Sequence, residues 1–258
     1  MKVDVSLGRR KSLDEISVHP GRRFGIVKPL KHARIAEKRY GGSWQDYLPV
    51  HTFFDSSKAA YAANGHRMFL HSDFGIECAE MLFGTEITTS HGLTIPVRQL
   101  GMDHMVEDNG RLNTVAEWLD RLPDADWMLR PARLSKFLDY RDDPLAAAAR
   151  RYGGAPANYA AIVAFFERPV ELAGARRARV VTHNSFMIFV AEQIFGSVLM
   201  IDNKPIPLRQ VAEDLVLARY GFIPSLQDIA GHLQVDAYVR GRDAGHGIRE
   251  RKQIVSAC

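Results

Sequence analysis

The hydrophobic and polar positions of this chain follow a pattern that occurs twice. The segment RYGGSWQDYLPVHTFF, residues 39–54, returns 112 positions later as RYGGAPANYAAIVAFF, residues 151–166. The register continues without a gap as far as Gly84 in the first copy and Gly196 in the second, and it resumes after the loss of one residue. Self-similarity at a fixed spacing marks the internal duplication of a structural unit.

The duplication divides the chain into four parts. We expect a basic N-terminal arm over residues 1–29, a first repeat unit over 30–138, a second repeat unit over 142–238 and a basic C-terminal tail over 239–258. The second unit is degenerate, because it keeps the apolar positions of the first and loses most of its polar ones.

Each unit has the same predicted plan of helices around one β-hairpin. A helical period that ends at glycine indicates a helix, and apolar–polar alternation on both sides of a turn indicates a hairpin. The first unit is predicted to contain helices over 31–40, 50–55, 66–83 and 98–109, and strands over 86–90 and 93–97. The hairpin of the second unit is predicted over 198–201 and 205–208.

Two capping boxes predict a further helix at the same place in each unit. Thr114 is followed three residues later by Glu117, and Ser225 is followed by Asp228. In such a pair each side chain accepts a hydrogen bond from the backbone N–H of the other residue. The predicted fold class is therefore α+β and predominantly helical, a tandem duplication of a helix–hairpin–helix unit with a pseudo-twofold arrangement.

The composition is that of a soluble globular protein, with 46% hydrophobic and 25% charged residues. No apolar run is long enough to cross a bilayer, and the first residues lack the apolar segment of a secretory signal. Two cysteines, Cys78 and Cys258, are too few for a disulfide framework. We expect a cytoplasmic protein with no membrane partner.

The net charge of +4 is unevenly distributed. Residues 1–38 carry ten basic and four acidic side chains, residues 240–258 carry five and two, and the body between them carries nineteen and twenty-four. Basic ends of this kind either remain solvated or dock on an acidic partner. The residues expected to contact such a partner, or the phosphates of nucleic acid, are Arg9, Arg10, Lys11, Arg22, Arg23, Arg249, Arg251 and Lys252.

The polar residues of the first unit also carry a resemblance. The series RYGGxxxDYLPxHxxFDxSKA, then HRxxxHxxxGI, then a hairpin, then PVRxxGxxHxxEDxGRxxT resembles an uncharacterised group of small bacterial and phage proteins, a domain of unknown function. The resemblance covers residues 32–122, and the second unit departs from it at most polar positions. It implies no activity, but it directs attention to the histidines of the first unit.

One set of residues in the first unit could hold a metal ion. His104 and Asp108 are four residues apart, so one helical turn can present both to the same ion. Position 104 falls on an apolar stripe in the second unit, and helical periodicity places His71 on the core side as well. We therefore predict a buried cluster of His71, His104 and Asp108, with His51 or Asp55 as a fourth group.

Imidazole and carboxylate ligands of this kind suit zinc, iron or manganese. In a catalytic role the ion would activate a water molecule, and Glu80 or Glu107 would accept its proton.

The second unit supports a structural alternative. It replaces His104 by Leu215 but keeps His71 as His183. A histidine that persists without its partner ligand is also explained by a hydrogen bond to a backbone carbonyl or to the glutamate of the helix, which is Glu80 in the first unit and Glu192 in the second.

Two functions are left open. The favoured one is a non-catalytic component of a homo-oligomer or of a larger assembly such as a virion. Its basic ends would bind neighbouring subunits, or would bind nucleic acid without sequence specificity. This function needs no cofactor. The alternative is a metal-dependent hydrolase of phosphoesters, with one active unit, one degenerate unit and one divalent ion. No phosphate-binding glycine loop, cysteine pair or nucleophile elbow favours another class.

Overall fold

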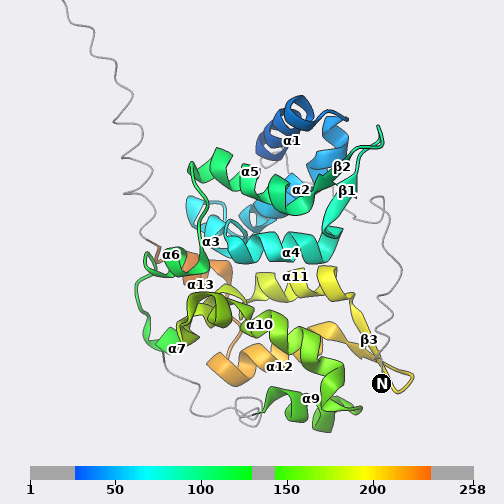
Figure 1. Cartoon of the computed structure of the whole chain (residues 1–258). Coiled ribbons are helices and arrows are strands. Elements are labelled where there is room, and N and C mark those ends of the chain that lie inside the picture. The colour runs from blue at the N-terminus through cyan, green and yellow to red at the C-terminus, as the bar shows by residue number, and fades with distance from the viewer. Residues whose placement is uncertain (1–26, 130–142, 234–258) are drawn as a thin grey trace, which may run out of the picture. The chain divides into compact units, whose positions relative to one another are not determined.

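The computed structural model describes residues 27–129 and 143–233 (Figure 1). They form two compact units, the first drawn from residues 27–62 and 69–113 and the second from residues 63–68, 114–129 and 143–233. The basic residues predicted to contact a partner, Arg9 to Arg23 and Arg249 to Lys252, lie outside the described ranges.

Helices α1, α2, α4 and α5 and one hairpin build the first unit. Their bounds are Val27–Tyr40, Trp44–Asp55, Asp73–Phe83 and Val97–Asn109, and the strands are β1 (Glu86–Thr88) and β2 (Thr94–Pro96). A 3-10 turn, η2 (Ser56–Ala59), follows α2. Helix α1 packs on α2, and both α2 and α4 pack on α5. The unit is therefore a group of packed helices with a small antiparallel hairpin beside α4 and α5.

The second unit repeats this order of elements. It contains α9 (Pro144–Tyr152), η4 (Pro156–Tyr159), α10 (Ala160–Ala173), η5 (Arg176–Val181), α11 (Ser185–Phe195), β3 (Val198–Ile201), β4 (Lys204–Pro207), α12 (Leu208–Tyr220) and α13 (Leu226–Ala230). Earlier elements also belong to it, namely η3 (Asn64–His66), α6 (Val115–Leu119) and α7 (Asp126–Leu129). Helix α6 packs on α10 and η5, and α13 packs on η3.

The repeated RYGG segment ends the first helix of each repeat. Gly41 and Gly153 have φ of 79° and 92°, a left-handed conformation that glycine adopts without steric cost. The hydroxyl of Tyr47 donates to the carbonyl of Gly41 at 2.7 Å, and Tyr159 donates to Gly153 at 2.8 Å. Both copies of the segment therefore form the same helix end and the same tyrosine contact.

Both predicted capping boxes are confirmed. Thr114 accepts from the backbone N–H of Glu117 at 3.2 Å, and Glu117 accepts from that of Thr114 at 2.9 Å. Ser225 and Asp228 make the same pair of contacts at 3.2 and 2.8 Å. The helices that they start, α6 and α13, are short.

The continuous helix predicted over residues 66–83 is wrong. The segment forms η3, then α3 (Arg67–Leu70), and a bend at His71 and Ser72 precedes α4. Ser72 has extended backbone angles (φ −146°, ψ 174°), and its hydroxyl accepts from the backbone N–H of Gly75 at 3.4 Å, so it is the N-cap of α4. A serine that caps the backbone in this way competes with helix continuation.

The other predicted helices and both hairpins agree with the structure to within a few residues, except that α2 begins at Trp44 and not at residue 50. The structure is mostly helical with two two-stranded antiparallel sheets, and the two repeats share one order of elements. Within the described ranges, no helix has both the length and the apolar character needed to cross a membrane.

The bend before α4 gives a test of this fold. A Cβ atom at Gly75 would lie 1.8 Å from the carbonyl oxygen of Leu70, and neither backbone position can move without reshaping the bend. We expect Gly75→Ala to lower the free energy of unfolding by at least about 3 kcal/mol, which places it among the severe substitutions. Urea unfolding measures this loss.

Gly101→Ala is the control for that substitution. Its Cβ would meet the ring of Phe54 at 2.8 Å, and the ring can shift where a backbone carbonyl cannot. The loss should therefore be smaller at residue 101 than at Gly75, and equal losses would contradict the tight bend.

Candidate metal centre

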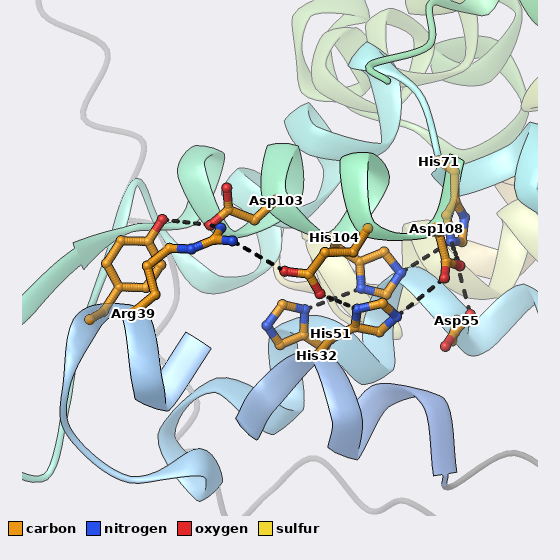
Figure 2. A network of polar contacts seen from close by, with 10 residues as sticks. His32, Arg39, His51, Asp55, His71, Asp103, His104 and Asp108 are labelled. Atoms are coloured by element: carbon orange, nitrogen blue, oxygen red, sulfur yellow. Dashed lines mark hydrogen bonds and ion pairs between the residues drawn. The ribbon is translucent and has the colours of Figure 1, made fainter. Parts of the chain in front are cut away.

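Three segments of the first unit bring polar side chains together in its core (Figure 2). Helix α2 contributes His51 and Asp55, and α5 contributes His104 and Asp108. Each pair is four residues apart, so both members project from the same face of their helix. The bend between α3 and α4 contributes His71, which the cap at the next residue fixes in place.

Four of these residues converge on one point. Nε2 of His71 lies 3.1 Å from Nε2 of His104, 3.4 Å from Oδ2 of Asp108 and 3.9 Å from Oδ1 of Asp55. One ligand atom from each of the four lies within 4.8 Å of the others. The sequence therefore placed His71, His104 and Asp108 in the correct group, and Asp55 is the fourth member.

The spacing of these atoms suits a single ion. Zinc binds imidazole nitrogen and carboxylate oxygen at about 2.0–2.2 Å, so two ligands of one ion lie about 3.3–4.4 Å apart, depending on the angle between them. Of the three separations from His71 Nε2, 3.4 and 3.9 Å lie within that range and 3.1 Å lies just below it, so only small side-chain adjustments are needed. Imidazole nitrogen with carboxylate oxygen also suits iron and manganese.

Burial lowers the pKa of two imidazoles of the group, those of His104 and His51. His104 is 0% exposed, and burial, followed by the neighbouring His71, His32 and His51, lowers its pKa well below the usual value. Burial and then His32 lower the pKa of His51 to about 3. A neutral imidazole has a lone pair free for a metal, whereas a protonated one has none.

The carboxylates of the group are almost as deeply buried as the imidazoles. Asp55 is 6% exposed, and the side chain of Asp108 is 5% exposed. Removing two carboxylates from water costs free energy unless a positive charge compensates them. A divalent cation would supply that compensation.

His51 extends the group beyond the four converging residues. Its Nδ1 lies 3.1 Å from Nδ1 of His104, while its Nε2 is buried and has no hydrogen-bond partner within the described ranges. Buried polar atoms without a partner are rare in folded proteins, and an ion or water often accounts for them. His51 is thus a further polar group at the edge of the centre.

His32 on α1 is a member that the sequence reasoning missed. Its Nε2 lies 3.3 Å from Oδ1 of Asp108, and its Nδ1 lies 2.6 Å from Oε2 of Glu107. Burial lowers its pKa, but the hydrogen bonds to Asp108 and Glu107 outweigh burial, and the net pKa is raised. The sequence did hold a signal for His32. The second repeat replaces it by Pro144, just as it replaces His104 and Asp108 by residues of a different type.

The predicted proton acceptors lie in different places. Glu107 contacts the centre through His32. Glu80 instead accepts two hydrogen bonds from Arg98, at 3.1 and 2.6 Å. The second repeat keeps this pair as Glu192 and Arg209, which indicates a structural role.

A polar network connects the centre to a contact that both repeats share (Figure 2). In the first repeat Asp103 accepts from the hydroxyl of Tyr40 at 2.5 Å and pairs with Arg39, which also lies 3.7 Å from Glu107. In the second repeat, the equivalent tyrosine, arginine and aspartate make the same contacts, and they are Tyr152, Arg151 and Asp214. This triad is therefore part of the scaffold.

His183 shows what remains of the centre in the second repeat. It stands directly before Asn184, the N-cap of α11, as His71 stands before the cap of α4. Its Nδ1 lies 3.2 Å from the carbonyl oxygen of Arg179 and 3.2 Å from the hydroxyl of Thr182. His183 therefore has the contact with a backbone carbonyl that a histidine kept for a structural reason would make.

These contacts predict metal binding by the first repeat alone. Protein purified without chelator should contain about one transition-metal ion per chain, and His71→Ala should lose it, because a missing ligand commonly costs more affinity than the 10–100-fold of an outer-shell change. Elemental mass spectrometry measures the content. His183→Ala is the matched control and should keep the ion. If both variants keep the ion, or if both lose it, the assignment of the metal site to the first repeat is contradicted.

Comparison with known proteins identifies the family. No curated protein and no solved structure matches the chain. A family described as a domain of unknown function, DUF6915, matches in two segments, residues 27–128 and 145–239, which together span most of the chain and agree with its duplication. The chain therefore belongs to the DUF6915 family.

Proposed function

We propose that the first repeat binds one divalent transition metal and uses it to hydrolyse phosphoesters. The observation that carries this proposal is the buried convergence of Asp55, His71, His104 and Asp108. The second repeat lacks two of these four groups and would be inactive, since Leu215 and Arg219 occupy the positions of His104 and Asp108.

The donor set favours catalysis over a structural ion. Structural zinc sites are built mainly from cysteine, whereas catalytic sites use histidine and carboxylate ligands. The buried cysteine Cys78 is not a member of the group. Further titratable groups, His32 and Glu107, border the centre, and a purely structural ion would have no use for them.

The protein's own residues would have distinct roles in this reaction. His71, His104, Asp55 and Asp108 would hold the ion, whose chemistry is to lower the pKa of a bound water toward neutrality. The carboxylate of Glu107 orients the ring of His32 at 2.6 Å, so that the opposite nitrogen faces Asp108. This pair is in position to hold and exchange a proton at the edge of the centre.

Two glutamate variants test the reaction and its proton acceptor. With bis(4-nitrophenyl) phosphate and 4-nitrophenyl phosphate as probes, Glu107→Gln should lower kcat by about 100-fold or more, since general bases contribute 10²–10⁴-fold. Glu80→Gln should leave kcat within a few-fold, because Glu80 pairs with Arg98. His104→Ala should abolish turnover. Metal-loaded protein that hydrolyses neither probe would overturn the hydrolase and leave a structural ion.

The uneven charge of the sequence supports a second proposal. Residues 1–38 and 240–258 are basic and the body between them is acidic, so the ends could bind neighbouring subunits or nucleic acid in a virion or another assembly. Deletion of residues 1–24 should then abolish self-association or weaken DNA binding, measured by analytical ultracentrifugation and by fluorescence anisotropy. A monomer that ignores DNA with or without the arm would contradict this role.

A further inference from the structure

The second repeat has a cavity where the first repeat has its group of candidate metal ligands. The cavity has a volume of about 230 Å³ and lies among α9, α10, η5 and α12. Its wall contains the repeat counterparts of His32, His51, Asp55, His71, His104 and Asp108, and these are Pro144, Val163, Glu167, His183, Leu215 and Arg219.

The substitutions reverse the charge of this position. Arg219 stands where the first repeat has Asp108, and Ala218 stands where it has Glu107. Both residues line the cavity. In the first repeat, α5 offers two carboxylates at these positions. In the second repeat, α12 offers a guanidinium and an alanine at the same positions.

Two arginines face the cavity, and only one of them is neutralised. Arg179 forms a close ion pair with Glu167, with Nε at 2.8 Å from Oε1 and a terminal nitrogen at 2.7 Å from Oε2. Arg219 makes no hydrogen bond or ion pair with any residue in the described parts of the chain. Two guanidinium groups and one carboxylate thus leave the cavity wall with a net positive charge.

The surroundings of Arg219 make this charge costly in the empty cavity. Burial, and then repulsion from Arg179, lower the pKa of its guanidinium; Tyr220 and Glu167 offset part of this effect, and Arg176 adds a smaller repulsion. Arginine nevertheless stays protonated in proteins. His183 does not add a further charge at neutral pH, because burial and then Arg179 and Arg219 lower its pKa to about 3. An anion in the cavity would relieve this repulsion.

We propose that this cavity binds a small phosphate-type oxyanion, either free or as the terminal group of a small phosphomonoester. Planar guanidinium groups match the geometry of phosphate oxygens and can donate two parallel hydrogen bonds. The volume of about 230 Å³ lies below the range of roughly 300–1,000 Å³ for drug-sized ligands, so it suits a small ligand. Apolar side chains from Val163, Phe166 and Leu215 complete a wall that strengthens the charge interaction by excluding water.

Calorimetric titration of the full chain tests the site, with inorganic phosphate, glycerol 3-phosphate and acetate as probes. The protein is first stripped of metal on a chelating resin, so that no ion in the first repeat can hold phosphate. We expect the wild type to bind one phosphate per chain. The phosphate affinity of Arg219→Gln should be at least about tenfold lower, because this variant loses one charge-assisted contact. Glycerol 3-phosphate separates the two sources, since a site open to phosphomonoesters binds it and a site for the free ion does not.

Arg209→Gln is the matched control. It removes the same charge from the same helix, but Arg209 pairs with Glu192 and does not line the cavity. This variant should keep its phosphate affinity within about twofold. An equal loss in the two variants would show non-specific attraction, and binding of acetate as strong as that of phosphate would overturn the phosphate assignment. Absence of phosphate binding by the wild type would overturn the proposal as a whole.

Two further measurements keep the result interpretable. Arg219→Gln removes the repulsion from Arg179, so it should unfold at a temperature no lower than the wild type in phosphate-free buffer, and it should lose the increase that phosphate gives the wild type. A lower unfolding temperature with an unchanged phosphate response would contradict the site. His104→Ala should keep its phosphate affinity, because the cavity does not depend on the metal centre; loss of binding there would place the phosphate in the first repeat.

Discussion

The arrangement of the first repeat depends on one electrostatic constraint, the burial of two carboxylates among buried imidazoles. Asp55 and Asp108 are almost removed from water, and His71 and His104 beside them are 0% exposed. Such a group is stable only if a cation or a full set of hydrogen bonds compensates it. Helices α2 and α5 and the bend before α4 meet at this point, so the packing of the whole unit is linked to how the charge is balanced.

The scaffold that holds this group is shared by both repeats. The helix end at the RYGG segment, the contact of Tyr40 and Arg39 with Asp103, and the cap at Ser72 all recur at equivalent positions. These contacts are local or join neighbouring helices, so they survive a change of the core side chains. His183 keeps its place for the same reason, because the residue before the cap of α11 is held by the backbone of the preceding turn.

Against this constant scaffold, the two repeats diverge in the chemistry of one position. The first offers oxygen and nitrogen ligands that suit a cation, and the second offers apolar walls and the guanidinium of Arg219. Loss of imidazoles and acids from a fixed backbone leaves space, and the arginine gives that space a positive charge. Duplication followed by substitution at a few core positions can thus produce two sites of opposite charge preference in one chain.

The sequence by itself determined the duplication, most helix positions, both capping boxes and the inward position of His104 one helical turn before Asp108. Each follows from local periodicity, or from comparing the repeats, and needs no knowledge of distant contacts. Only the tertiary structure decided that the chain bends before α4, that His32 joins the centre and that the second repeat encloses a cavity. The bend arises because the Ser72 hydroxyl competes with the helix backbone, and His32 reaches Asp108 because α1 packs on α2 and α5. These are long-range or competing interactions, which a pattern of apolar positions does not encode.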